Sequence, residues 1–229
     1  MCTDQLWSML LPLLSKAVEE SYEFVHVQIP KNLNFSEISA FLNSYFEEDK
    51  VNIIGFSLGG YISANFTASF PERVNKAFII ANSPCALSQQ EIKQRQEIVK
   101  FVNQHGYKGM SKARAAQLFD CSKWSKSQLE QLINIMITMD AELGEPEFNS
   151  QMRFTSNRVD LFQPLVSSHI QLTFYYSDHD PLVNSAWLAK LAQQNSKCEM
   201  ICSSGASHML PLEKPQELAK HILKWLNPY

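Results

Sequence analysis

The most informative part of this sequence is VNIIGFSLGG, residues 51–60, where an apolar run enters a glycine-rich bend and a helix-forming segment leaves it. Glycine is scarce in the chain, with 7 among 229 residues, yet three of the seven lie in this short stretch. A chance match to the pattern G-x-S-x-G has an expectation of about 0.02 at the chain's own glycine and serine frequencies. The pattern and its flanks therefore favour a strand, a sharp turn and a helix, with Ser57 at the turn.

The residue types in this bend have a physical explanation. A serine at a sharp strand-to-helix turn is held in a strained backbone conformation, and Gly55 and Gly59 carry no Cβ to collide with the crossing elements. We therefore expect Ser57 Oγ to project from the carboxyl end of the strand as a nucleophile. The Leu58 amide, at the helix N-terminus, would donate to an oxyanion on an attacked carbonyl. The alternative is a glycine-rich turn that only lets a helix pack closely on a strand.

Strands and helices are expected to alternate along the chain on both sides of this bend. The strand-like apolar runs are Phe24–Ile29, Val51–Ile54, Ala77–Ala81, Leu172–Tyr176 and Glu199–Cys202. Helical spacing of apolar residues predicts helices over Trp7–Ala17 and Gly59–Phe70, and a last helix that begins at Pro215. Such alternation is typical of an α/β protein with a mostly parallel sheet and helices on both faces.

Residues 88–160 interrupt this alternation. They contain helical patterns at Ile92–Gln104 and Ser127–Leu143 and no convincing strand. The sequence thus predicts one domain over residues 1–229 with a helical insertion at 88–160. Two interpretations of the insertion stay open, a cap over a functional site or a helical extension without such a role.

A serine hydroxyl is a weak nucleophile at neutral pH and needs a base, which is usually a histidine held by a carboxylate. Among six histidines, His208 directly follows the last strand-like run, where a loop would return to the carboxyl edge of the sheet. Asp178 and Asp180 follow the preceding strand and compete for the role of the carboxylate, and either could instead be a simple turn residue. The chain order of serine, aspartate and histidine is the one expected when the serine lies on an elbow of this kind.

Charge and composition exclude several classes of protein. Lys plus Arg number 20 and Asp plus Glu number 23, so the formal charge is −3 and nucleic acid is not an expected partner. No apolar run reaches the ~20 residues that span a bilayer, and no basic leader precedes an apolar run as in a signal peptide. Five scattered cysteines suit reduced thiols, which predicts a cytoplasmic location. Cys198 and Cys202 lie in a strand-like run about 13 Å apart, so we expect no metal site there.

With these motifs the chain resembles the α/β-hydrolase superfamily over nearly all of its length. FPERV at residues 70–74 resembles the exit from the nucleophile helix, and HMLPLEKP at residues 208–215 resembles the histidine loop. The family often carries a G-x-x-D pattern at the acid turn, which puts Ser177 in the glycine position and makes Asp180 the triad acid, with Asp178 in reserve. The resemblance also implies that residues 88–160 are the cap that shapes the acyl or alcohol pocket.

The start of the chain departs from the family pattern. In the family a second oxyanion donor comes from a loop after an early central strand, before the first helix. Residues 1–7 look like the entry to that helix, so we expect the N-terminal strands and the second donor to be missing. Loss of one donor costs about 10² to 10³ in rate. We hypothesise that Met1 corresponds to an internal methionine of a longer reading frame.

The resemblance implies an esterase-like or thioesterase-like serine hydrolase that acts on a small-molecule carboxylic ester or thioester. Ser57 would attack, His208 would carry the proton, Asp180 would orient the imidazole and Leu58 would stabilise the oxyanion, with no metal or organic cofactor. Two alternatives remain. One is a lyase that uses the triad as a base, as in the menaquinone-pathway branch of the family, and the other is a catalytically weak binding protein that lacks the N-terminal oxyanion loop.

Overall fold

A single parallel sheet organises the chain, whose computed structural model describes residues 1–18 and 22–227. The sheet consists of β1 (Val51–Phe56), β2 (Val74–Ile80), β3 (Gln171–Ser177) and β4 (Cys198–Ser203), paired in the order β1-β2-β3-β4. All three pairings are parallel, and the register sets Phe78 of β2 beside Ile54 of β1 on one side and Thr173 of β3 on the other. The four strands therefore end at one common edge, the carboxyl edge.

One of the five predicted strands was wrong. The run Phe24–Ile29 is extended but forms no strand, whereas the other four runs are confirmed. A strand requires a neighbouring backbone to accept its hydrogen bonds. In the described part of the chain, β1 pairs only with β2, and a cavity lies between the free edge of β1 and residues 22–30.

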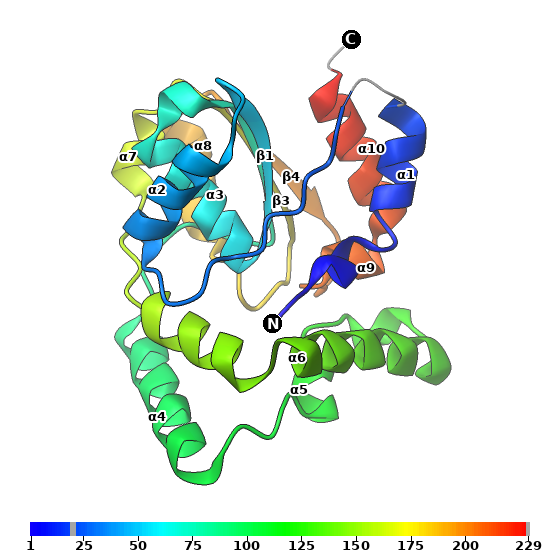
Figure 1. Cartoon of the computed structure of the whole chain (residues 1–229). Helices are drawn as coiled ribbons and strands as arrows, with labels where there is room; N and C mark the ends of the chain where they lie inside the picture. Colours follow the sequence, from blue (N-terminus) through cyan, green and yellow to red (C-terminus); the bar gives the residue numbers. More distant parts are fainter. Residues whose placement is uncertain (19–21, 228–229) are drawn as a thin grey trace.

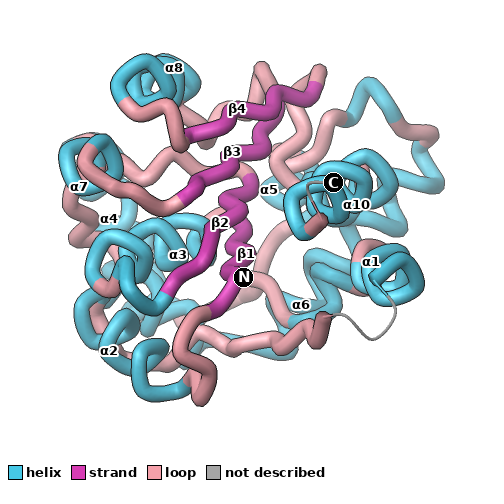
Figure 2. Tube along the Cα trace, turned by 90° about the horizontal axis from the view of Figure 1, so that it is seen from above, coloured by secondary structure: helices cyan, strands magenta, loops and turns pink. Residues whose placement is uncertain are grey.

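Helices cover both faces of the sheet (Figure 2), which confirms the predicted fold class. One face carries α2 (Phe35–Tyr45), α3 (Leu58–Ser69), α7 (Phe162–Val166) and α8 (Ser185–Gln194). The other face carries α1 (Leu11–Val18) and α10 (Pro215–Leu226), with the short α9 (Leu210–Glu213) ahead of α10. None of the helices in the described residues is both long and apolar enough to traverse a bilayer.

The helix ends follow from local sequence. Asn34 and Glu37 form a capping box at the start of α2, and Pro215 occupies the first turn of α10, where its missing N–H is not needed. The single helix predicted over Trp7–Ala17 is divided into a 3₁₀ turn, Asp4–Trp7, and α1. Pro12 has no N–H to donate to the carbonyl of the preceding turn, so one continuous helix is disfavoured there.

The stretch between β2 and β3 is helical, as predicted, and lies across the carboxyl edge of the sheet (Figure 1). It contains α4 (Gln89–His105), α5 (Lys112–Ala116) and α6 (Lys126–Phe154). The second predicted helix is longer than expected, because α6 bends at Gly144, with φ of 65°, and then resumes. We call residues 88–160 the helical insertion.

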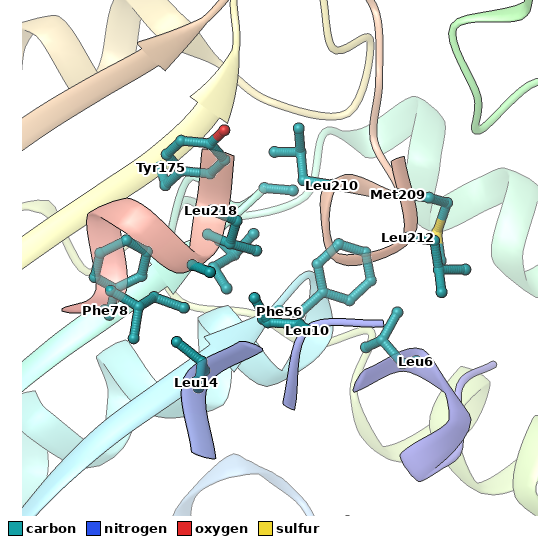
Figure 3. Packing of buried hydrophobic residues seen from close by; sticks show 14 of the residues in the cluster. Leu6, Leu10, Leu14, Phe56, Phe78, Tyr175, Met209, Leu210, Leu212 and Leu218 are labelled. Carbon is teal, nitrogen blue, oxygen red and sulfur yellow. The ribbon is translucent and has the colours of Figure 1, made fainter. Parts of the chain in front are cut away.

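Two apolar clusters hold the layers together, one on each face of the sheet. Figure 3 shows Leu6, Leu10 and Leu14 from the N-terminal segment gathered with Phe56 and Phe78 of the sheet. On the opposite face, buried side chains of α2, α3, α7 and α8 pack against the strands. Burial on both faces explains the continuous apolar run at residues 77–80 of β2, where an alternating pattern would leave polar side chains buried.

Candidate active site

Ser57 lies in the bend between β1 and α3 in a strained conformation. Its φ of 50° and ψ of −115° are rare for a residue with a Cβ, and such strain costs about 1 to 3 kcal/mol. The Ser57 N–H donates to the carbonyl of Ile80 over 2.9 Å, which ties the bend to the end of β2. The strain expected from the sequence is therefore present, and a backbone hydrogen bond to the neighbouring strand supports it.

Two glycines permit the bend, Gly55 as expected and Gly60 in place of Gly59. A Cβ on Gly55 would lie 2.2 Å from the carbonyl oxygen of Gly59, and a Cβ on Gly60 would lie 2.9 Å from Asn82 Cβ. Nothing lies within 4 Å of a Cβ built on Gly59, so the role predicted for that residue was wrong. Gly55 lies on β1 and Gly60 on α3, so the two close approaches occur where α3 crosses β1 and the end of β2.

The three residues predicted for the triad are hydrogen-bonded in a row. His208 Nε2 lies 3.1 Å from Ser57 Oγ, and His208 Nδ1 lies 2.8 Å from Asp180 Oδ2. With the proton on Nδ1, His208 donates to Asp180 and leaves Nε2 free to accept from the serine hydroxyl. Asp180 and His208 are buried, whereas Ser57 is half-buried and borders a cavity. The arrangement can therefore pass a proton from the serine to the imidazole.

The alternative acid, Asp178, is engaged elsewhere. It is exposed and accepts hydrogen bonds of 2.7 Å from the Gly205 amide and from His179 Nδ1. The Gly205 amide, and after it the His179 side chain, lower the pKa of Asp178. Asp180 is thus the carboxylate that lies beside His208.

The acid turn and the histidine loop are also joined directly. Ser177 Oγ donates to the carbonyl of Ser207 over 2.7 Å, and both residues are buried. The Leu182 amide donates to Asp180 Oδ1 over 2.9 Å, which fixes the orientation of the carboxylate. The serine that stands in the family's glycine position therefore helps to hold the two loops together.

The Leu58 amide lies at the N-terminus of α3, next to Ser57. Among the described residues no group accepts a hydrogen bond from this amide, and the Ser57 side chain does not cap the helix. The amide is thus free to donate to a developing negative charge beside the nucleophile.

An anchor that was not predicted from the sequence joins the helical insertion to the histidine loop. The amides of His208 and Met209 both donate to the carbonyl of Leu118, at 3.0 and 3.2 Å. Within the same contact, the Ala206 amide donates to Asp120 Oδ2 over 3.2 Å. The loop that carries the imidazole is therefore held by backbone groups of the insertion.

Glu213 completes this anchor. Its Oε1 accepts from the Asp120 amide and from Trp124 Nε1, both at 3.0 Å, and the residue is buried. Burial raises the pKa of Glu213. One signal was available in the sequence, because Glu213 directly follows the apolar run MLPL, residues 209–212.

A cavity of about 1370 Å³ adjoins Ser57 and His208. Its walls come from the helical insertion, from the free edge of β1 and from residues 22–30. Within residues 1–18 and 22–227, no three His, Cys, Asp or Glu side chains are grouped so as to hold a metal ion, and all five cysteines are free thiols. The cavity is large enough for a small organic molecule.

The family described as the alpha/beta hydrolase fold matches residues 32–215 of the chain. Solved structures are similar over nearly the whole chain. A thermophilic esterase from Thermogutta terrifontis has a TM-score of 0.76 at 14% identity, covering 97% of this chain and 85% of the esterase. A hydrolase from Pseudomonas aeruginosa has a TM-score of 0.76 at 16% identity, covering 99% of this chain and 86% of that one.

A carboxylesterase from Bacillus subtilis is also similar, with a TM-score of 0.70 at 15% identity, covering 98% of this chain and 79% of that enzyme. At this level of identity the likeness establishes the fold alone. Among curated proteins, no sequence matches this chain.

Proposed function

The chain belongs to the α/β-hydrolase family, and from this membership we propose that it is a serine hydrolase that cleaves a carboxylic ester or thioester through an acyl-enzyme. The observation that carries the proposal is the hydrogen-bonded row of Ser57, His208 and Asp180. Rows of this geometry perform acyl transfer on several unrelated folds. The esterases among the similar structures agree with an ester substrate.

In the first half of the reaction, Ser57 Oγ attacks the carbonyl carbon of the substrate while His208 Nε2 takes the serine proton. The carbonyl oxygen becomes an oxyanion, to which the Leu58 amide donates. When the tetrahedral intermediate collapses, the bond to the alcohol or thiol breaks, and His208 returns the proton to that leaving group. The product of this half is an ester between the acyl group and Ser57.

In the second half, water attacks the acyl-enzyme and His208 Nε2 takes a proton from the water. The intermediate then releases the carboxylic acid, and His208 returns the proton to Ser57 Oγ. Asp180 stays ionised throughout and stabilises the imidazolium through Nδ1–H. Every step uses only water and the side chains and amides described above.

We propose that residues 1–229 form one domain in which the helical insertion caps the site. The insertion contributes walls to the cavity beside Ser57, and the Leu118 carbonyl accepts from the loop that carries His208. These two contacts favour a cap over a helical extension without an access role. The bound substrate would thus be a small molecule enclosed between the carboxyl edge and the insertion.

A panel of 4-nitrophenyl esters, from acetate to dodecanoate, tests the proposed function. We expect hydrolysis of at least the short-chain esters by the wild type and none above background by Ser57→Ala. A protein in which no ester is turned over would contradict the ester hydrolase. If Ser57 reacts with a fluorophosphonate probe but the protein hydrolyses none of these esters, the lyase alternative is favoured. A lyase needs the same triad but forms no acyl-enzyme.

A further inference from the structure

Two arginines from different parts of the helical insertion line the cavity that adjoins Ser57. Arg95 lies on α4 and Arg158 follows the end of α6, and both are half-buried. Arg95 Nη1 donates to Ser156 Oγ over 3.3 Å, and Arg158 Nε donates to the carbonyl of Thr155 over 3.3 Å. Both guanidinium groups are therefore attached to one short segment, residues 155–158.

This segment lies against the helix that begins at the nucleophile. The Arg158 guanidinium carbon is 5.3 Å from the centre of the Tyr61 ring, and Tyr61 OH donates to the carbonyl of Val159 over 2.8 Å. Tyr61 follows Ser57 by one helical turn, about 6 Å along the axis, and its amide donates to the Ser57 carbonyl. The Arg158 guanidinium thus packs against a residue one helical turn from Ser57, and both Arg158 and Ser57 line the same cavity.

The two charges have no carboxylate partner among the described residues, since no Asp or Glu oxygen lies within 4.0 Å of either guanidinium. Glu91, whose charge acts on both arginines, uses its carboxylate to accept from the Ser88 amide. Asp160, two residues after Arg158, accepts from Trp187 Nε1.

Burial, and after it the charge of Arg95, lower the pKa of Arg158 to about 10, so the group remains charged at neutral pH. Two like charges partly withdrawn from water are costly, and a bound anion would remove that cost.

Carboxylates also line this cavity, namely Asp140, Glu142 and Glu147 on α6 and Asp4, Glu23, Glu47 and Glu48 in other segments. Asp140 accepts from Tyr107 OH and the Met110 amide, and Glu147 accepts from Gln151 Nε2. Lys50 and Arg114 also line the cavity, so Arg95 and Arg158 differ from them as a pair that one segment, residues 155–158, holds together.

We propose that Arg95 and Arg158 form an anion subsite, and that the substrate of Ser57 is an ester or thioester bearing a carboxylate on its acyl chain or a phosphate on its leaving group. Guanidinium groups present paired N–H donors that match the oxygens of either anion. No described group accepts a hydrogen bond from either terminal nitrogen of Arg158, so both are free to donate to a ligand. This proposal rests on the proposed serine hydrolase and names its substrate class.

Matched pairs of substrates test the subsite. Mono-4-nitrophenyl adipate and neutral 4-nitrophenyl hexanoate differ by one carboxylate on the acyl chain. Hexanoyl-4′-phosphopantetheine and hexanoyl-pantetheine differ by one phosphate on the leaving group. We expect the wild type to have the higher kcat/KM for the anionic member of one pair, and that pair identifies where the anion lies on the substrate.

Substitution of the arginines should remove this preference. Arg158→Gln and Arg95→Gln should each lower kcat/KM for the preferred anionic substrate by about tenfold to a hundredfold, and that for its neutral partner by less than about threefold. Arg153→Gln is the control, because Arg153 is exposed and donates to Asn103, and it should change neither. If neutral substrates are preferred in both pairs, or if both members of a pair lose activity equally, the anion subsite is wrong.

The two proposals fail in different ways. If the wild type cleaves none of the four substrates, the hydrolase is wrong, and the subsite is then tested by calorimetric titration of Ser57→Ala protein with adipate and with 4′-phosphopantetheine. Binding that is lost when Arg95→Gln is added supports the subsite without any turnover. No binding of either compound to folded Ser57→Ala protein overturns it. Arg95→Gln is suited to this step, because the Arg95 side chain makes only one hydrogen bond among the described residues, to Ser156 Oγ.

Discussion

β1 and β2 are neighbouring strands with opposite surroundings. β2 pairs on both edges, and its residues 77–80 are fully buried. In the described part of the chain β1 pairs only with β2, and its residues 51–54 are only partly buried, because a cavity lies along the free edge. The serine nevertheless follows β1, the less protected strand.

The difference shows from which side the candidate nucleophile is held. Ser57 receives its support from the β2 side, through the hydrogen bond to Ile80, and its two partners come from loops after β3 and β4. Among residues 1–18 and 22–227, none on the outer side of β1 forms a backbone hydrogen bond with the bend, and this side borders the cavity. We infer that the chemistry depends on the inner side of the site and that substrate choice depends on the outer side and the insertion.

The largest expected effect concerns the inner side. Asp180→Asn should lower kcat for an ester by about 10³- to 10⁴-fold with little change in stability, because the histidine would lose the carboxylate that sets its tautomer. Asp178→Asn is the matched control, since Asp178 is exposed and does not contact His208. Equal losses in the two variants, measured by steady-state kinetics, would mean that the assignment of the acid is wrong.

A comparison of alanine substitutions at two glycines tests which of them the bend requires. Gly55→Ala should cost about 3 kcal/mol or more of unfolding free energy, because the new Cβ would lie 2.2 Å from the backbone oxygen of Gly59. Gly59→Ala should be neutral or stabilise by up to about 0.5 kcal/mol, since it fills open space on a helix. Urea unfolding of both variants checks this, and a similar cost at the two positions would contradict the packing described.

The contrast between the two strands is itself measurable. Ile79→Ala on β2 should cost about 3 kcal/mol, as expected for a fully buried side chain, whereas Ile53→Ala on β1 should cost about 1 kcal/mol. Chemical denaturation gives both values. If Ile53→Ala proves as costly as Ile79→Ala, the free edge of β1 is covered in solution and the comparison fails.

The smallest effect concerns the anchor of the histidine loop. Glu213→Ala should cost about 2 kcal/mol, because it leaves the Asp120 amide and Trp124 Nε1 without their acceptor. Burial raises the pKa of Glu213 above its ordinary value near 4.5, so the folded state favours the protonated form. The protein should therefore lose stability as the pH rises through this range.

Glu213→Gln removes this titration while keeping an oxygen acceptor. Relative to the variant, the wild type should lose stability between about pH 4.5 and the raised pKa, as measured by thermal unfolding at a series of pH values. Parallel stability curves for the two proteins would show that the buried carboxyl does not titrate in this way.

Part of the candidate site could be predicted from local sequence patterns. Ser57 was predictable because strand, bend and helix are encoded in ten consecutive residues, and His208 because its loop follows a recognisable strand. Asp180 could not be separated from Asp178 by position alone, since both follow β3, and the resemblance to a family was needed to choose between them. The parallel sheet was predictable because its buried strands are continuous apolar runs.

Features that depend on packing between distant elements could not be predicted from the sequence. Gly60 rather than Gly59 makes the second close approach, because the crossing of α3 over β2 decides which position is crowded. The run Phe24–Ile29 has the composition of a strand but no paired neighbour. The convergence of Arg95 and Arg158 depends on how α4 and α6 pack, which no local pattern reports.

The measurement that tests the central claim most directly is reaction of the chain with a fluorophosphonate probe, followed by mass spectrometry of the labelled peptide. We predict one adduct, on Ser57, that is absent in Ser57→Ala and forms far more slowly in His208→Ala, because the imidazole must take the serine proton. An unlabelled Ser57, or labelling that proceeds at the same rate without His208, would contradict an activated serine in this bend.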